Sequence, residues 1–173
     1  MASSSGKKAI FILASSNFRD PEFLVPKKVL EDAGVTVLAS SSSPVSKGVE
    51  GAAVKADVLL KDLNPSDYDV VGFIGGPGAT EYFDDPKAHS IAKGALVSGK
   101  ILASICAAGA TLARAGVLKG RRATAFESRA SDLIKGGANY TGADVEVDGK
   151  IITANGPKAA KAFGEAIVKA LGG

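Results

Sequence analysis

The sequence predicts an α/β fold with a mostly parallel central sheet. Short apolar runs of the buried-strand type alternate along the chain with longer stretches of helical periodicity, a pattern typical of βαβ units. Several of the apolar runs end abruptly in glycine, serine or asparagine, as expected where a strand meets a turn. The clearest strand patterns are 8–14, 69–74 and 100–105, and the clearest helical patterns are 21–33, 86–98 and 158–171.

The first helix has the plainest boundaries. Asp20 is expected to be its N-cap, Pro21 suits its first turn, and Gly34 is expected to end it. A second strand is expected directly afterwards, at 35–40.

The remaining predicted elements are shorter. They are a hairpin within 45–62 around Gly48 and Gly51, helices at 107–115 and 131–135, a strand at 122–126, and paired strands at 144–147 and 151–154. The last two strands are joined by Asp148-Gly149, which predicts a type I′ turn.

Length and composition suit one globular domain. The chain has 173 residues, of which 46% are hydrophobic and 23% are charged. A domain of this size buries roughly 70% of its unfolded surface, so a core can form without disulfides. We expect a flexible tail over residues 1–7 and a single domain over residues 8–173.

The charge pattern argues against nucleic-acid or membrane partners. The net charge is only +3, and the densest basic group, 119–122, has no interleaved aromatic residues. No apolar run approaches the roughly 20 residues of a membrane span. One cysteine and one histidine, His89, exclude an internal disulfide and a multi-cysteine zinc site. We therefore expect a cytoplasmic protein without metal or cofactor.

Cys106 is the first candidate for chemistry. It follows the buried strand 100–105 directly and precedes a helix of small residues, the arrangement of a nucleophile elbow. Ligands of open α/β sheets bind at this carboxyl edge, and the helix N-terminus favours a thiolate there. Ala107 and its small neighbours let backbone amides approach an oxyanion. A lone cysteine is also often a small core residue, and this segment alone leaves both interpretations open.

The loop 75–78, Gly-Gly-Pro-Gly, is the second candidate. It follows a buried strand, so the amides of Gly75 and Gly76 could converge with those after Cys106. The spacing matches neither a phosphate loop nor a dinucleotide fingerprint. An oxyanion-binding loop and a plain tight turn both fit.

Glu22 is the third candidate, near the start of the first helix and beyond the end of the first strand. A charged carboxylate would raise the pKa of a nearby thiol. Apolar neighbours such as Phe18 and Phe23 could instead keep Glu22 protonated, so that it donates a hydrogen bond to sulfur. An ordinary carboxylate stabilised by the helix dipole is the alternative.

Together these segments resemble the PfpI family of intracellular cysteine proteins, in the superfamily that includes the parkinsonism-associated protein deglycase. The resemblance extends from Lys8 to Leu171 and rests on segments 22–26, 33–34, 67–71, 75–78, 103–107, 112–120 and 153–157. It implies a flavodoxin-like three-layer sandwich with a nucleophile elbow, usually a homodimer or higher oligomer.

The resemblance also implies roles for individual residues. Cys106 is implied as the nucleophile and Glu22 as the carboxyl that hydrogen-bonds it. Gly76 and Ala107 match positions whose amides line the oxyanion site. Ala107 and Phe126 depart from the family pattern: peptidase-like members carry histidine directly after the cysteine, and other members carry histidine or tyrosine where this chain has Phe126.

Three functions follow from these residues. The first is a cysteine-dependent enzyme acting on small reactive carbonyls, of the glutathione-independent glyoxalase or deglycase type, with Glu22 as acid/base. The second is an intracellular cysteine peptidase, which the missing histidine disfavours because no general base is placed beside the thiol. The third is a non-enzymatic redox sensor or stress-response chaperone, in which Cys106 is oxidised.

Overall fold

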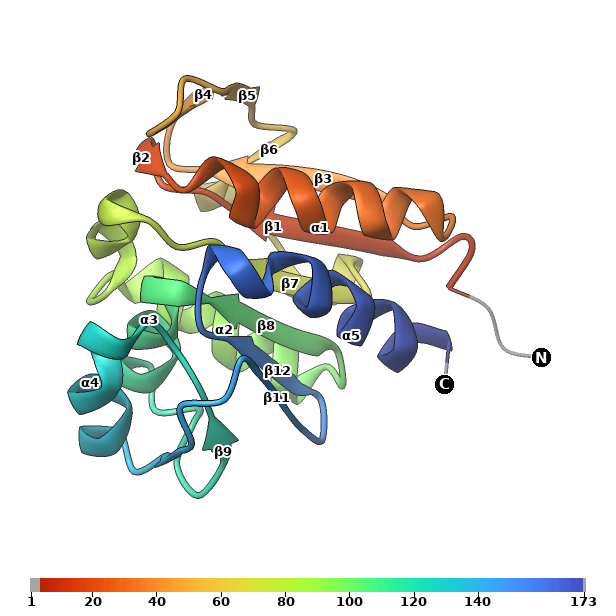
Figure 1. Ribbon diagram of the computed structural model, residues 1–173. Coiled ribbons are helices and arrows are strands. Elements are labelled where there is room, and N and C mark those ends of the chain that lie inside the picture. The colour runs from red at the N-terminus through yellow and green to blue at the C-terminus, as the bar shows by residue number, and fades with distance from the viewer. Residues whose placement is uncertain (1–3, 173) are drawn as a thin grey trace.

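The computed structural model describes residues 4–172 and contains a seven-stranded central sheet (Figure 1). The strand order is β11-β12-β8-β7-β1-β3-β6, and every neighbouring pair is parallel except β11 with β12. The strands are β1 (Lys8–Ile12), β3 (Thr36–Ser41), β6 (Val58–Leu59), β7 (Val70–Phe73), β8 (Ile101–Ile105), β11 (Val145–Asp148) and β12 (Ile151–Ala154). The predicted α/β fold with a mostly parallel sheet is confirmed.

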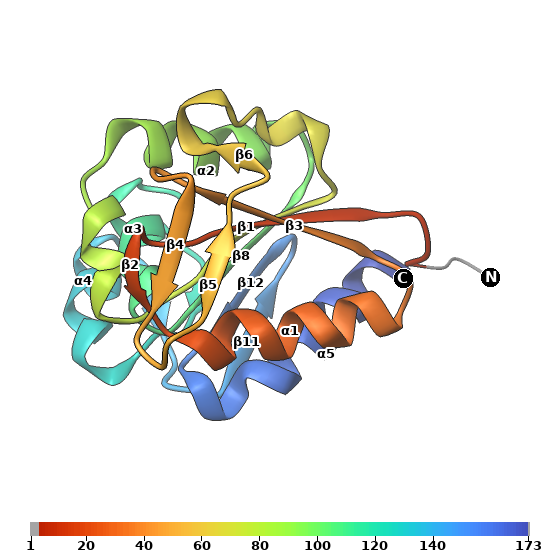
Figure 2. The same cartoon turned by 90° about the horizontal axis from the view of Figure 1, so that it is seen from above.

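Helices cover both faces of the sheet and complete a three-layer sandwich (Figure 2). One face carries α1 (Asp20–Asp32) and α5 (Ala160–Gly172). The other carries α2 (Pro86–Val97), α3 (Gly109–Arg114) and α4 (Ala130–Lys135). Because the sheet is buried on both faces, its central strands read as continuous apolar runs rather than alternating ones.

Strand β1 shows how one apolar run supplies both cores. Ile10 and Ile12 lie in the cluster under α2, whereas Ala9 and Phe11 lie in the cluster under α1 and α5. All four side chains are fully buried. Alternate residues of a strand point to opposite faces, so each face receives every second side chain.

Two small sheets flank the central one. The first combines β2 (Ser16–Phe18), β4 (Val45–Gly48) and β5 (Ala53–Lys55), and the second pairs β9 (Arg122–Ala123) with β10 (Asn139–Tyr140). The hairpin predicted within residues 45–62 is confirmed for β4 and β5, which pair antiparallel. Strand β6 instead joins the edge of the central sheet.

The predicted capping role of Asp20 is wrong. Arg19 occupies the N-cap position without a side-chain cap, and Asp20 is the first helical residue. The Asp20 carboxylate instead accepts hydrogen bonds from the backbone N–H groups of Glu50 (2.9 Å) and Ala52 (2.8 Å). It therefore ties the loop after β4 to the start of α1.

The strand predicted at 122–126 is shorter than expected, because β9 ends at Ala123. The N–H groups of the following residues do not pair with a neighbouring strand. The N–H of Thr124 donates to the Thr153 side chain (3.0 Å), and the N–H of Phe126 donates to the carbonyl of Cys106 (3.1 Å).

The predicted type I′ turn between β11 and β12 is also wrong. Asp148 pairs with Ile151, so Gly149 and Lys150 are the central turn residues. Gly149 has a φ of +60°, but Lys150 is not among the residues with positive φ. A type I′ turn needs positive φ at both positions, whereas a type II′ turn needs it only at the first.

A flexible tail is expected over residues 1–7. Residues 1–3 lie outside the described part of the chain, but Ser4 is buried and its hydroxyl donates to the carbonyl of Ala33 (2.9 Å). Within residues 4–172, no helix combines the length and apolar character that crossing a membrane requires.

Candidate active site

Cys106 lies at a sharp turn between β8 and α3. Strand β8 is buried along its whole length, and Cys106 follows it with a φ of +60°. A left-handed conformation is unfavourable for a residue with a Cβ, so the surrounding structure must hold it. A 3₁₀ turn over Cys106–Ala108 then leads into α3, so the α-helix begins two residues later than predicted. This is the geometry of the expected nucleophile elbow.

The glycine loop after β7 lies directly against Cys106. A Cβ added at Gly75 would lie 2.7 Å from the Cβ of Cys106 and 2.7 Å from Oε1 of Glu22. Gly76 has a φ of +111°, and a Cβ there would collide with the backbone nitrogen of Arg19. The N–H of Arg19 donates to the carbonyl of Gly75 (3.0 Å). Glycine is therefore required for three chain segments to meet at this point.

Replacing Gly75 with alanine is expected to destabilise the protein. The added methyl group has no free space, and overpacking of this kind costs about 1–3 kcal/mol. Denaturant unfolding measures the loss, with Gly156→Ala as the control, because a Cβ at Gly156 meets only the Phe126 ring at an ordinary 3.8 Å. Equal losses of stability in the two variants would contradict the packing described here.

Glu22 lies in the first turn of α1 and is fully buried. Burial raises the pKa of its carboxyl group from 4.5 to about 7, while contacts with the Cys106 thiol, the charge of Arg19 and the N–H of Gly75 lower it. Neither carboxyl oxygen has a partner of regular hydrogen-bond geometry, so these contacts only partly offset the cost of burial. At neutral pH the protonated and charged forms of Glu22 are therefore both populated.

The pKa of the Cys106 thiol is raised by its surroundings, whereas a helix N-terminus on its own lowers the pKa of a thiol. Burial, the charge of Glu22 and the hydrogen bond to Glu22 together raise the pKa of the thiol to about 12, and the N–H groups of Ala107 and Gly76 lower it less. The side chain is only 6% exposed. Protonation of Glu22 removes its charge and with it the Coulomb contribution to the thiol pKa.

Replacing Glu22 with glutamine is expected to stabilise the protein at alkaline pH. The folded-state pKa of about 7 exceeds the ordinary 4.5, so the folded protein binds a proton more tightly than the unfolded chain does. Stability therefore falls as pH rises from about 4.5 to about 7, by up to about 3 kcal/mol.

Chemical unfolding of the wild type and the Glu22→Gln variant at pH 4.5 and pH 8 measures this effect. The variant should gain stability over the wild type only at pH 8. Glu165→Gln is the control, because Glu165 is exposed on α5. The account is wrong if the gain is the same at both pH values.

A cavity of about 220 Å³ opens over the sulfur of Cys106. It is lined by the ends of several connections at the carboxyl edge of the sheet, where open α/β folds bind ligands. The lining residues are Arg19, Gly76, Pro77, Thr80, Phe83, Cys106, Ala107, Phe126, Ser128, Arg129 and Pro157. Glu22 is not among them, and its carboxyl group contacts the thiol of Cys106.

The structure therefore brings together all the residues singled out in the sequence. Gly76, Ala107 and Phe126 line the cavity with Cys106, and Gly75 packs closely against both Cys106 and Glu22. The Phe126 side chain is 46% exposed and offers no acid or base. His89 does not line the cavity, and its Nε2 atom lies 2.7 Å from the carbonyl oxygen of Phe83.

Sequence reasoning missed several wall residues, among them Arg19, Phe83 and Arg129. Each belongs to a connection that follows a strand of the central sheet or reaches its carboxyl edge. Of these three residues, only Arg19 could have been predicted from the rule that ligands bind at the carboxyl ends of parallel strands, because it lies between the first strand and the first helix. Nothing in the local sequence around Phe83 or Arg129 indicates that the two residues meet across the cavity.

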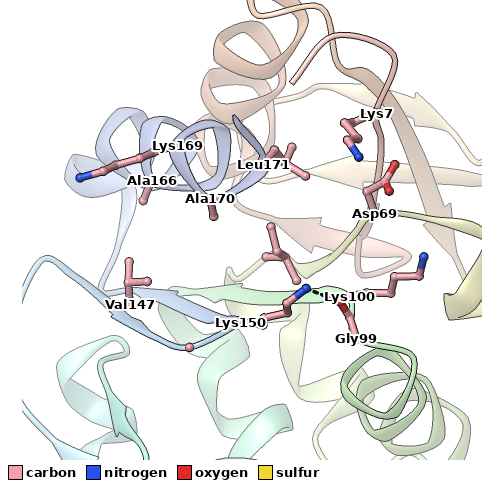
Figure 3. Close-up of a pocket in the computed structure, with 12 residues that line it drawn as sticks. Lys7, Asp69, Gly99, Lys100, Val147, Lys150, Ala166, Lys169, Ala170 and Leu171 are labelled. Atoms are coloured by element: carbon pink, nitrogen blue, oxygen red, sulfur yellow. Dashed lines mark hydrogen bonds between the residues drawn. The ribbon is translucent and has the colours of Figure 1, made fainter. Parts of the chain in front are cut away.

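A larger cavity, of about 830 Å³, lies at the opposite edge of the sheet (Figure 3). Its walls include residues that precede the strands, such as Asp69, Lys100 and Lys150, together with the last turns of α5. Lys150 donates to the carbonyl of Gly99 (2.7 Å), and Asp69 accepts from the N–H of Lys8 (2.9 Å). The described residues that line this cavity include no cysteine, serine or threonine, so the smaller cavity, which contains Cys106, is the candidate active site.

The fold and site define a class of protein, an α/β sandwich with a buried cysteine at a nucleophile elbow and a carboxyl group beside it. The DJ-1/PfpI family model matches residues 7–170. The chain therefore belongs to the DJ-1/PfpI family.

Individual relatives match almost end to end. A deglycase of Pyrococcus abyssi is 34% identical over 94% of this chain and 98% of its own. A glutathione-independent glyoxalase of Caenorhabditis elegans is 30% identical over 96% of this chain and 90% of its own. The crystal structure of a ThiJ/PfpI domain protein from Brachyspira murdochii superimposes with a TM-score of 0.93, at 30% identity, over 99% of this chain and 98% of that one.

Proposed function

We propose that this protein is a cysteine-dependent enzyme acting on small reactive carbonyl compounds, of the glutathione-independent glyoxalase or deglycase type. The observation that carries the proposal is the buried pair of Cys106 and Glu22 beneath a small cavity, with the pKa of Glu22 raised to about 7. A general acid/base works best when its pKa lies near the operating pH. The names of the two relatives described above support the same class of reaction.

The first step is addition of sulfur to the aldehyde carbon of a 2-oxoaldehyde. As the S–C bond forms, the thiol proton moves to the Glu22 carboxylate, so no free thiolate is needed beforehand. The aldehyde oxygen becomes negatively charged, and the N–H groups of Gly76 and Ala107 are the donors placed to stabilise it. Protonation of that oxygen by Glu22 gives a hemithioacetal and restores the carboxylate.

The second step moves a proton between the two carbons. The Glu22 carboxylate removes the proton from the former aldehyde carbon, which gives an enediolate. The hydroxyl proton passes to the neighbouring oxygen, and Glu22 returns its proton to the neighbouring carbon. The product is a thioester of a 2-hydroxy acid on Cys106. Water then cleaves the S–C bond, which releases the hydroxy acid and restores the thiol. The substrate is isomerised and hydrated, so no external oxidant or reductant is consumed.

The other two functions fit the site less well. Peptide hydrolysis needs an acid that protonates a poor amine leaving group, and His89, bonded to the Phe83 carbonyl, does not reach the cavity. Peroxide sensing needs an accessible thiolate, whereas the Cys106 side chain is only 6% exposed.

The reaction class is tested by supplying the purified protein with methylglyoxal and, separately, with a fluorogenic peptide, without glutathione. We expect lactate from methylglyoxal and no cleavage of the peptide. Peptide cleavage without lactate would favour the peptidase. Neither product, together with a mass gain of two oxygen atoms at Cys106 on peroxide treatment, would favour the redox sensor. The expected homodimer and cytoplasmic location stay predictions.

A further inference from the structure

The walls of the candidate active site carry an unbalanced positive charge. Arg19 and Arg129 are the two ionisable cations of the cavity, and neither aspartate nor glutamate is among its described lining residues. Whether these charges are available to a ligand depends on their other partners.

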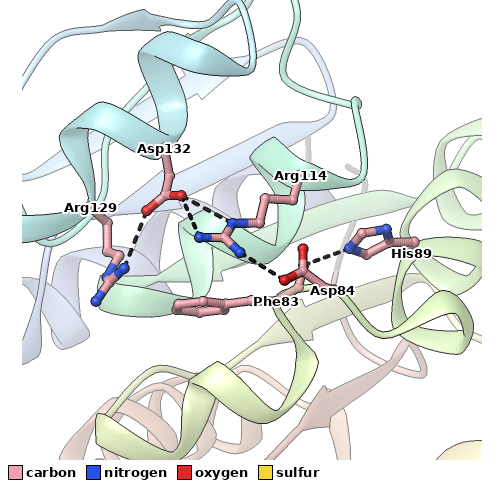
Figure 4. A network of polar contacts seen from close by, with 6 residues as sticks. All are labelled: Phe83, Asp84, His89, Arg114, Arg129 and Asp132. Carbon is pink, nitrogen blue, oxygen red and sulfur yellow. Dashed lines mark hydrogen bonds and ion pairs between the residues drawn. The ribbon is translucent and has the colours of Figure 1, made fainter.

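Arg129 is already neutralised by its surroundings (Figure 4). Its guanidinium group pairs with Asp132 at 3.3 Å, and Asp132 also binds Arg114 at 2.9 Å. Arg114 in turn pairs with Asp84 at 2.8 Å. Two arginines and two aspartates balance, and both guanidinium groups lie over the Phe83 ring, at 5.1 and 5.2 Å from its centroid. The charge of Arg129 is therefore compensated within this cluster and is not available to a ligand.

Arg19 has a different environment. Its side chain is half-buried, and within residues 4–172 no ion pair or side-chain hydrogen bond is recorded for it. The nearby Asp20 carboxylate is occupied by the N–H groups of Glu50 and Ala52. The charge of Arg19 nevertheless acts on the site, because it is among the influences that lower the pKa of Glu22 against the larger effect of burial.

The backbone of Arg19 fixes where this charge sits. Its N–H donates to the carbonyl of Gly75, and Gly76 lies so close that a side chain there would strike the Arg19 nitrogen. The guanidinium group therefore extends from a backbone position that is held against the loop supplying an oxyanion donor. A guanidinium group binds a carboxylate through two parallel hydrogen bonds.

We infer that Arg19 selects substrates that carry a carboxylate close to the reacting carbonyl group. This inference rests on the proposed function and names its substrate class, small 2-oxoaldehydes whose short carbon chain also carries a carboxylate. The cavity of about 220 Å³ limits the substrate to a short carbon chain.

The test compares two alkylating reagents of nearly equal size, iodoacetate and iodoacetamide. Each forms an S–C bond to Cys106 with loss of iodide and of the thiol proton, and only iodoacetate carries a carboxylate. Cys106 is the single cysteine, so the mass gain of the intact protein reports on it alone. The ratio of the two rate constants cancels the fraction of thiolate, which both reactions share.

The iodoacetate-to-iodoacetamide ratio should fall about tenfold in Arg19→Gln relative to the wild type, as expected for loss of one opposite charge a few ångströms away. Arg19→Lys should keep most of the preference. Arg122→Gln on β9, outside the cavity, should leave the ratio unchanged. An equal ratio in the wild type and Arg19→Gln would overturn the inference.

Alkylation needs the sulfur but no turnover, so this result does not depend on the proposed reaction. A second measurement uses turnover. The ratio of kcat/KM for 4,5-dioxopentanoate over methylglyoxal should fall in Arg19→Gln. Lactate formation with an unchanged ratio would overturn the role of Arg19 while leaving the proposed function intact.

Discussion

Cys106→Ala is expected to abolish formation of lactate from methylglyoxal, lowering kcat at least about a thousandfold, as removal of an enzyme nucleophile does. The chain has no second thiol that could take over the addition step. Alanine fills nearly the same space and keeps the backbone turn, so the variant should fold. The measurement is the initial rate of lactate formation, with thermal unfolding to show that the variant is native.

His89→Gln provides the matched control for the nucleophile experiment. His89 is the only histidine and lies outside the cavity, so this variant should keep most of the wild-type rate. If Cys106→Ala retained turnover, the thiol would not be the nucleophile. If His89→Gln lost turnover instead, a histidine-dependent reaction would replace the one proposed here.

Glu22→Gln is expected to have the second largest effect. The Glu22 carboxylate takes the thiol proton, so kcat/KM of the wild type should rise with pH and level off above about 7, the pKa that burial gives this group. Loss of the acid/base should lower kcat/KM by about 10²- to 10⁴-fold and remove the step from the pH profile. The measurement is kcat/KM for methylglyoxal between pH 5 and pH 8.5.

Glu127→Gln is the control for the pH profile, because Glu127 neighbours Phe126 but does not line the cavity over Cys106. That variant should keep the step near pH 7. A step of unchanged position and height in Glu22→Gln would assign the titration to another group. Together with the stability gain expected at pH 8, a loss of activity in Glu22→Gln would show that the buried carboxyl is retained for chemistry at the expense of stability.

The central strands were predictable because each is apolar on both faces. Residues 8–14, 69–74 and 100–105 read as buried strands without knowledge of their partners, and β1, β7 and β8 occupy these segments. The errors arose where distant residues decide the local structure. Asp20 resembles a helix cap, but its partners Glu50 and Ala52 come from a loop some 30 positions further along the chain.

Part of the site was predictable from the positions at which the strands end. Cys106, Glu22 and Gly75 each follow a central strand, and carboxyl ends of parallel strands share one edge. The raised pKa of the thiol was not predictable, because it depends on how deeply packing buries the sulfur. Arg129 and Asp132 are only three positions apart, but the pairs of Arg114 with Asp84 and Asp132 join separate connections, so the sequence gives no indication of them.

The most direct test of the central claim is the initial rate of lactate formation from methylglyoxal at pH 8, measured side by side for the wild type, Cys106→Ala and Glu22→Gln. The account predicts turnover by the wild type that is lost in Cys106→Ala and strongly reduced in Glu22→Gln. A wild-type rate no higher than that of Cys106→Ala would contradict the assignment of carbonyl chemistry to this pair.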